Sequence, residues 1–212
     1  MKVSMCGFIL HVSEGNSKLG KTMNWSLTPG QTCSKDACNT CYKNGCYARG
    51  IVSRRENVAK AWGDNTRAMM WCEKNDYWSS FICTMDDIIN KRQPKSFRIH
   101  VGGDFFSRDY FVAWVKIAML HPEVSFFAFT KQWDKVKGIA LPKNFALIAS
   151  SWTGLVIPKW AKGRLPVAWL VEKGCPVPVR RNRKTHVCQG DCTKCHWCDT
   201  LKKNDVAFMK HR

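Results

Sequence analysis

Apolar and polar residues alternate with two different periods along the middle of the chain, and each period predicts a different element. Residues 97–101 place Phe, Ile and Val between Arg and His, which is the two-residue period of a strand. Residues 107–118 begin with a serine that can cap a helix and then repeat apolar positions every three or four residues. The apolar runs at 124–130, 145–149 and 167–171 have the length of buried strands, with helix-length spacers between them.

This alternation predicts an α/β fold. Parallel strands joined by helical crossovers form either an open parallel sheet or a partial (β/α) barrel, and both place functional sites at the carboxyl ends of strands. A further helix is predicted over residues 55–71, where Gly63 weakens the periodicity without ending it.

The composition changes at Gly174, after which Cys, Pro, Arg and Lys dominate. We therefore expect an α/β core over residues 1–173 and a Cys-rich C-terminal module over residues 174–212. This module is too polar to have a core of its own, so we expect a metal to organise it.

The twelve cysteines indicate metal binding once the compartment is considered. No apolar stretch is long enough to span a bilayer, and the first residues do not have the pattern of a cleaved signal, so we expect a cytoplasmic protein without a membrane partner. Thiols stay reduced there, which favours metal ligands over a disulfide framework.

The charge balance predicts an acidic partner. The chain has 34 Lys and Arg against 16 Asp and Glu, a formal net charge of +18. A surface with this much positive charge would attract RNA, DNA or an acidic protein. In the alternative interpretation, the basic residues only keep the protein soluble. Nothing in the sequence indicates an oligomeric state.

The first cysteine group lies in the loop 33–46 and consists of Cys33, Cys38, Cys41 and Cys46. Thiolates at this density bind a soft metal strongly enough to order a loop that has no other reason to be ordered. The group predicts a metal site without specifying the metal.

The second cysteine group lies near the end of the chain and consists of Cys188, Cys192, Cys195 and Cys198. Its C-x2-C-x2-C run is typical of ferredoxin loops, in which neighbouring thiolates reach separate irons of one cluster. Structural zinc usually takes ligand pairs from separated segments, so the crowding favours iron–sulfur. Two alternatives stay open: zinc bound by Cys188, Cys192, Cys195 and either Cys198 or His196, and Cys175 as a ligand in place of Cys188.

The remaining cysteines, Cys6, Cys72 and Cys83, lie singly among apolar residues, so we expect them in the core as small hydrophobic side chains. The histidines show no ligand spacing. His100, beside the diglycine, is expected to be packed or solvated rather than a ligand.

Several motifs together identify a family. They are GNSKLG at 15–20, SLTPG at 26–30 followed by Thr32 and Cys33, GCYA at 45–48, RIHVGGDF at 98–105, FTK at 129–131, the thiols of Cys192, Cys195 and Cys198, and Ala207 with Phe208. With these motifs the chain resembles the phage gene product 88 family. For a phage-encoded protein the expected location is the host cytoplasm. The family in turn resembles radical-SAM proteins.

That relationship implies a [4Fe–4S] cluster held by three cysteines of the loop 33–46, with one iron open to S-adenosylmethionine. It also implies that Gly102, Gly103 and Asp104 stand where such enzymes use Gly-Gly-Glu to hold the methionyl amine. Glycines let a cosubstrate approach the backbone, and a carboxylate pairs with an ammonium group.

The sequence departs from the radical-SAM pattern in two ways. The spacing is C-x4-C-x2-C-x4-C instead of C-x3-C-x2-C, and the acid is Asp, one methylene shorter. If all four thiols are ligands, Cys41 included, the cluster would transfer electrons or hold structure. For Gly102-Gly103-Asp104, the alternative to a cosubstrate site is a turn that ends the strand, in which the Asp104 side chain bonds the backbone.

Two functional interpretations follow. In the first, the protein is a radical-SAM-like enzyme with an N-terminal [4Fe–4S] cluster and an auxiliary C-terminal cluster, acting on an anionic substrate such as a nucleic acid. In the second, it is a non-catalytic phage iron–sulfur or zinc protein that binds nucleic acid or a host factor.

Overall fold

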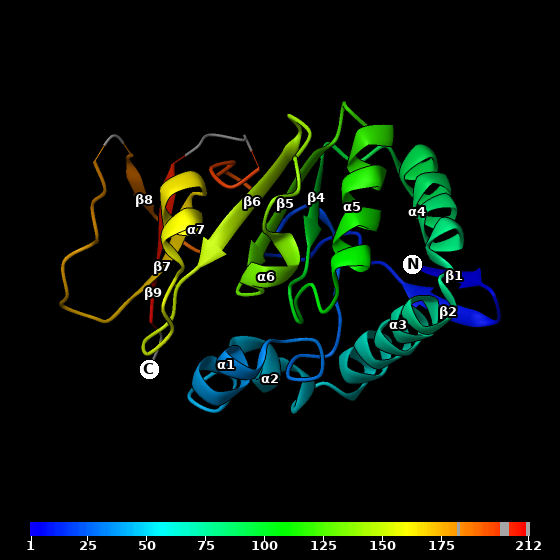
Figure 1. The fold of residues 1–212 in the computed structure, drawn as a ribbon, viewed down its shortest axis with the longest axis horizontal. Coiled ribbons are helices and arrows are strands. Elements are labelled where there is room, and N and C mark those ends of the chain that lie inside the picture. The colour runs from blue at the N-terminus through cyan, green and yellow to red at the C-terminus, as the bar shows by residue number, and fades with distance from the viewer. Residues whose placement is uncertain (182, 200–203, 211–212) are drawn as a thin grey trace.

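Seven parallel strands form one sheet in the order β3-β4-β5-β6-β7-β9-β8 (Figure 1). The structure is a computed structural model that describes residues 1–181, 183–199 and 204–210. The strands are β3 (Met23–Trp25), β4 (Ser96–Ile99), β5 (Ser125–Thr130), β6 (Phe145–Ser150), β7 (Val167–Val171), β8 (Thr185–Val187) and β9 (Asp205–Met209). The predicted α/β class is therefore confirmed, and the four expected strands are β4 to β7.

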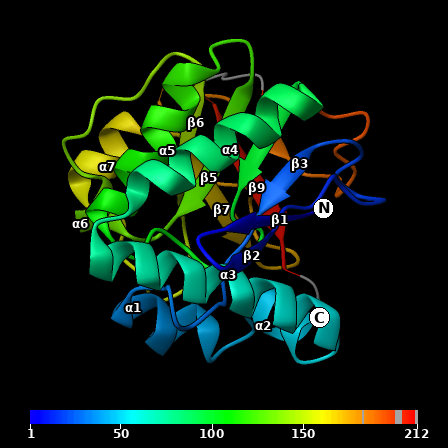
Figure 2. The same cartoon turned by 90° about the vertical axis from the view of Figure 1, so that its right-hand side faces the viewer.

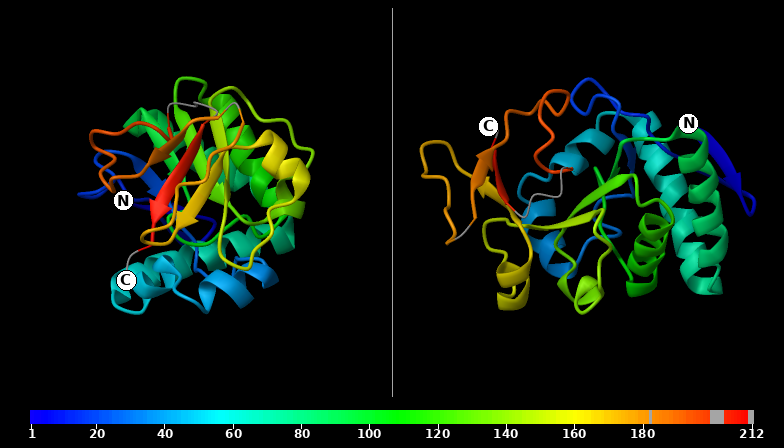
Figure 3. Two further views of the ribbon diagram at one scale, coloured as in Figure 1. Left: turned by 90° about the vertical axis from the view of Figure 1, so that its left-hand side faces the viewer. Right: turned by 90° about the horizontal axis from the view of Figure 1, so that it is seen from above.

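The helices are α1 (Lys35–Ala37), α2 (Tyr47–Val52), α3 (Glu56–Asn75), α4 (Trp78–Arg92), α5 (Arg108–Leu120), α6 (Trp133–Val136) and α7 (Lys159–Arg164), with a π-helical turn at Cys38–Tyr42. Helices α5, α6 and α7 are the crossovers that connect β4, β5, β6 and β7 in turn. Seen from above, these crossovers lie along one side of the sheet, and the cysteine-rich segment after β8 lies on the other (Figure 3).

The sheet is open in the part of the chain that the structure describes. Strands β3 and β8 are its two edges and do not pair with each other. Since each crossover adds the next strand on the same side, the order is compatible with a partial barrel, which stays a prediction.

A short antiparallel hairpin, β1 (Lys2–Met5) with β2 (Phe8–His11), stands apart from the main sheet. It packs on α3 and α4 near β3 (Figure 2). Both helices belong to the long connection between β3 and β4, which also carries the first cysteine group.

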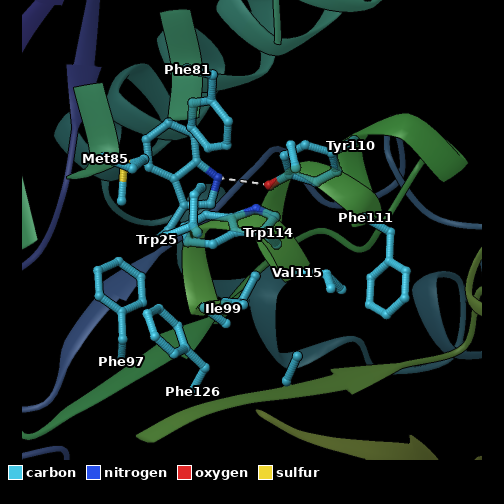
Figure 4. Packing of buried hydrophobic residues seen from close by; sticks show 14 of the residues in the cluster. Trp25, Phe81, Met85, Phe97, Ile99, Tyr110, Phe111, Trp114, Val115 and Phe126 are labelled. Carbon is cyan, nitrogen blue, oxygen red and sulfur yellow. Dashed lines mark hydrogen bonds between the residues drawn. The ribbon is translucent and has the colours of Figure 1, made fainter. Parts of the chain in front are cut away.

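Aromatic side chains from β3, α4 and α5 fill the core (Figure 4). The Trp25 indole donates a hydrogen bond of 2.8 Å to the Tyr110 hydroxyl, and both side chains are fully buried. Ser107 caps α5 as predicted, because its hydroxyl accepts the Tyr110 N–H at 3.1 Å. The predicted buried stripe of this helix, Phe111, Trp114, Val115 and Ala118, is also confirmed.

The C-terminal segment contributes two strands to this same sheet. Strand β9 lies between β7 and β8 and buries Val206 and Ala207. Residues after 174 therefore continue the sheet, and the division at that position stays a prediction. Among the described helices, none has the length and hydropathy of a bilayer-spanning segment.

His100, directly after β4, has an unusual backbone conformation. Its φ is +67°, its Nε2 lies 2.9 Å from the Tyr110 hydroxyl, and its buried Nδ1 has no hydrogen-bond partner. Burial and then the charge of Arg98 lower the pKa of His100 from 6.5 to about 3. The folded protein thus holds this imidazole neutral.

This predicts a pH-dependent stability difference between the wild type and His100→Asn, which tolerates positive φ and cannot be protonated. Below pH 6.5 the unfolded histidine binds a proton that the folded one refuses, so wild-type stability falls as pH falls toward 3, by up to about 1.4 kcal/mol per pH unit. Denaturant unfolding at pH 7, 6, 5 and 4 measures this. Parallel curves for the two proteins would contradict it.

Candidate functional site

The first cysteine group follows β3 in sequence. The carboxyl end of this strand lies at the edge of the sheet where the sequence predicts a functional site. Ser34 caps the short α1 by accepting the Ala37 N–H at 3.1 Å. The π-helical turn then carries Cys38 and Cys41, and Cys46 is the residue before α2.

Three thiols of this group are held by local backbone bonds. The Cys33 sulfur accepts the Gly30 N–H at 3.4 Å, and the Cys38 thiol donates to the Gly30 carbonyl at 3.2 Å. The Cys41 thiol donates to the Ala37 carbonyl at 3.4 Å and is buried. The sulfurs therefore sit on a tight loop and not on mobile chain.

The four thiols of this group influence one another electrostatically. Burial and then the negative charge of Asp104 raise the pKa of Cys33 to about 12, with smaller contributions from Cys38 and Cys41. Burial also raises the pKa of Cys38 and of Cys41, and the charge of Cys46 adds to both. The four residues therefore lie within range of one another's charge, and that they hold one metal centre stays a prediction.

No disulfide joins any of the twelve cysteines. In the described ranges, no three His, Cys, Asp or Glu side chains converge closely enough to hold a single metal ion. The metal sites predicted from the sequence stay predictions.

Gly102 and Gly103 allow two segments to approach the end of β4. A Cβ on Gly102 would lie 2.3 Å from the Trp62 ring of α3. Gly103 has a φ of +82°, and a Cβ there would lie 2.6 Å from the Thr32 hydroxyl oxygen. These glycines let α3 and the cysteine loop pack on the strand end.

Asp104 is buried and its carboxylate is occupied by protein donors. One oxygen accepts the Phe105 N–H at 2.8 Å and the Thr130 hydroxyl at 2.7 Å, and the other accepts the Lys131 N–H at 2.8 Å. Burial raises the pKa of Asp104 despite these bonds. Asp104 therefore forms the turn that the sequence offered as the alternative to a cosubstrate site. Its hydrogen bonds connect the end of β4 to the end of β5. Binding of S-adenosylmethionine at this turn stays a prediction.

Lys131, which closes the FTK motif at a predicted strand end, is a cation at this edge, and the sequence predicted its position but no role for it. Its ammonium donates to the Ser150 hydroxyl at 2.8 Å, and its charge lowers the pKa of Cys41 against the effect of burial. Its position directly after β5 was the available signal, since all strand ends of a parallel sheet share one edge.

An open groove of about 540 Å³ runs along the outer side of the cysteine loop. It is lined by Thr28, Pro29, Gly30, Gln31, Cys38, Tyr42, Lys43 and Arg49. The Arg49 guanidinium lies 5.2 Å from the centre of the Tyr42 ring. The groove gives a solute access to Cys38.

The second cysteine group lies on the face of the sheet away from the crossover helices. The Cys188 N–H bonds the Ala207 carbonyl at 2.8 Å, and the Cys192 N–H bonds the Lys18 carbonyl at 2.7 Å. Cys188 and Cys198 pack with buried residues of β6, β7 and β9. This loop therefore spans from β9 to the turn that precedes β3.

The histidine beside this group is His186. Its Nε2 lies 3.5 Å from the Cys195 sulfur, and its ring stacks on Trp197 with centroids 4.8 Å apart. His196, the histidine weighed as a zinc ligand, instead pairs with Asp199 at 3.1 Å. Cys175 lies exposed in the turn after β7.

Arg98 faces the second group from β4, and the sequence reasoning also missed its role. Its guanidinium lies 5.2 Å from the centre of the Phe129 ring, and Phe129 packs in the cluster that includes Cys188 and Cys198. Burial raises the pKa of Cys198 to about 12, and the charge of Arg98 opposes that rise. The signal available was alternation, since Phe97 and Ile99 point to the opposite face.

The expectation for the single cysteines was wrong at two positions. Cys72 is fully buried in α3 as expected, but Cys6 and Cys83 are exposed. Cys6 lies in the hairpin turn, and Cys83 lies on the outer face of α4, where apolar neighbours in sequence point inward.

Fold and cysteine loops define an α/β protein with two groups of four free thiols. The sequence model of the family described as Gene product 88 matches residues 10–201, so the chain belongs to that family. It is similar to the Gene 88 proteins of Mycobacterium phages D29 and L5, with 32% identity over 128 residues in each case. The aligned region covers 58% of this chain and 53% of each relative, so the match spans about half the length of these curated relatives. No solved structure matches.

The packing role of the diglycine can be tested by stability. Gly102→Ala should lower the free energy of unfolding by about 1–3 kcal/mol, because its Cβ overpacks against Trp62. Gly63→Ala is the matched control: its Cβ meets only the end of Arg67, and alanine in a helix interior should stabilise by about 0.5–1 kcal/mol. Urea unfolding measures both, and an unchanged stability of Gly102→Ala would show that packing does not require this glycine.

Proposed function

We propose that the protein is a phage iron–sulfur protein with two [4Fe–4S] clusters. Three of the thiols of Cys33, Cys38, Cys41 and Cys46, Cys33 among them, supply the ligands of the N-terminal cluster and leave one iron open, and Cys188, Cys192, Cys195 and Cys198 supply those of the C-terminal one. The observation that carries this proposal is the gathering of four buried or half-buried free thiols at each of two places on one sheet.

The arrangement of the thiols favours a cluster over a single ion. A lone zinc ion draws its ligands to one point, whereas the ligands of a cubane bind different irons and stand farther apart. The C-x2-C-x2-C run of Cys192, Cys195 and Cys198 suits ligands of separate irons in one cluster. Zinc at the second group, with the nearby His186 as a ligand, is the alternative.

Charge compensation supports the C-terminal cluster in particular. Arg98 is half-buried, and a guanidinium withdrawn from water is costly without an anion nearby. Burial lowers the pKa of Arg98, while the charges of Cys198, Cys192 and Tyr47 raise it. A thiolate-bound cluster carries the negative charge that this arginine would balance.

The N-terminal cluster would be the reactive one, because it lies at the carboxyl edge of the parallel strands. When bound, a site-open cluster of this kind supplies one electron to S-adenosylmethionine, giving methionine and, with a hydrogen atom taken from the substrate, 5′-deoxyadenosine. The residues of this chain would position the cosubstrate: the groove beside Cys38 admits it, and Lys131 offers a cation at the same edge.

One observation favours a second candidate function, a non-catalytic iron–sulfur protein that binds nucleic acid or a host factor. The carboxylate of Asp104 already accepts three hydrogen bonds from the protein, so pairing with an ammonium group would require it to exchange partners. In this case both clusters would serve to order their loops.

A turnover assay separates the two functions. Anaerobic protein with bound clusters is incubated with S-adenosylmethionine and dithionite, and 5′-deoxyadenosine is measured by chromatography. The enzyme is expected to form it, and Cys33→Ala to abolish it. Clusters that are reduced without forming this product would overturn the radical-SAM part of the proposal and leave the binding protein.

The assignment of ligands predicts that each of the two clusters can be lost separately. Cys33→Ala should lose the N-terminal cluster and Cys198→Ala the C-terminal one, so each variant should retain about half of the iron and sulfide. Cys83→Ala, an exposed thiol on α4, is the matched control and should retain all of it. Equal iron in all three variants would contradict the assignment.

The role of Arg98 predicts a shift in reduction potential. Arg98→Met removes a positive charge beside the C-terminal cluster, which destabilises its more negative reduced form and moves the midpoint potential to more negative values. Arg98→Lys should stay near the wild type. Redox titration followed by electron paramagnetic resonance measures this, and an unchanged potential in Arg98→Met would show that this charge does not act on the cluster.

A further inference from the structure

We propose that a ridge of cations formed by α7 and the segment before β8 binds the phosphate backbone of a nucleic acid. This basic ridge consists of the exposed residues Lys159, Lys162, Arg164, Arg181 and Lys184. The inference gives the anionic partner of the proposed function a place on the molecule, and it does not depend on which metal is bound.

A buried ion pair assembles the ridge from two distant segments. The fully buried carboxylate of Asp205 accepts the Val167 N–H at 2.9 Å, the Trp169 indole N–H at 3.2 Å and the Arg180 Nε–H at 2.6 Å. Arg180 also donates to the carbonyl of Leu165 at 3.0 Å and to that of Lys162. Arg180 is therefore a structural residue, and it fixes the basic run against α7.

A second contact continues this alignment. Arg183 donates to the carbonyl of Arg164 at 3.2 Å, so positions 180 and 183 both lie beside the carboxyl end of α7. The exposed residues Lys162 and Arg164 thus lie in a segment that is held beside the one carrying Arg181 and Lys184, although about twenty residues separate the two segments in sequence.

The ridge has almost no acidic counterpart. Between residues 156 and 187 the sequence contains a single acid, Glu172, which pairs with Lys210 at 3.0 Å. Within the described residues, none of the five cations of the ridge forms an ion pair. Concentrated positive charge without compensation attracts a polyanion and releases its counterions.

The chemistry of the surface favours nucleic acid over an acidic protein. Stable protein interfaces have an apolar, aromatic core, whereas nucleic-acid interfaces are polar and strongly positive. No aromatic side chain belongs to the ridge, and Trp197 nearby is occupied: it stacks on His186 and donates to the Asp205 carbonyl at 2.9 Å. We therefore expect phosphate contacts without base stacking, and so little sequence preference.

A charge-matched comparison tests the ridge. The ridge variant is Lys162→Gln, Arg181→Gln and Lys184→Gln in one chain. The control is Lys74→Gln, Lys91→Gln and Lys95→Gln, three exposed lysines around the ends of α3 and α4. Both variants lose the same charge, and circular dichroism confirms that both are folded. Binding to a fluorescent 20-nucleotide RNA and to a DNA duplex of the same length is measured from 50 to 300 mM salt.

The ridge variant is expected to bind at least tenfold more weakly, and the slope of log affinity against log salt should fall by about 2–3. The control should change by less than threefold. Equal losses in the two variants, a flat salt response of the wild type, or equal binding of polyglutamate would each overturn the proposal. The measurement is made on the protein as purified, so a failure here leaves the iron–sulfur proposal standing, and the reverse also holds.

Discussion

Buried sulfur cannot keep a negative charge unless a cation accompanies it, and this constraint governs both cysteine loops. Burial raises the pKa of Cys33 and of Cys198 to about 12, so without metal these thiols are neutral and poor ligands. The proposed metal centres would supply the missing positive charge and make the thiolate the stable form. The same charge balance explains why Lys131 stands beside the first loop and Arg98 beside the second.

The parallel sheet determines where the two loops can act. Because its strands share one direction, the first cysteine loop, the Gly102–Gly103 turn and Lys131 meet at a single edge although a hundred residues separate them in sequence. The second loop lies across the open face and reaches back to the turn before β3. Through Asp205, the strand β9 that supports this loop also anchors the basic ridge. The proposed cluster chemistry at the strand ends and the proposed nucleic-acid binding at the basic ridge would therefore use different surfaces of the protein.

The sequence predicted the parts of the fold that depend on local periodicity. Strands β4 to β7 and helices α3 and α5 were found because each contains a complete repeat of apolar positions. Strand β8 was not predicted, because it has only three residues among polar neighbours. Strand β9 was not predicted, because the C-terminal segment was judged too polar to have a core, whereas β9 gains one by pairing with β7. Family membership was also predicted from the motifs and is confirmed.

For the candidate site, the sequence identified the cysteines but not their surroundings. The thiols of each group influence one another's pKa, and that each group holds one metal centre stays a prediction. The packing of Trp62 on Gly102, the three bonds of Asp104 and the position of Arg98 arise from contacts across long separations in sequence, which a motif does not show. A glycine pair that resembles a cofactor motif can therefore also be explained by the helix packed against it.

The most direct test of two iron–sulfur centres is metal and sulfide analysis of anaerobically purified protein, combined with electron paramagnetic resonance of the reduced sample. Two [4Fe–4S] clusters predict about eight irons and eight acid-labile sulfides per chain, with spectra of reduced cubanes. Stoichiometric zinc without labile sulfide would contradict the central claim.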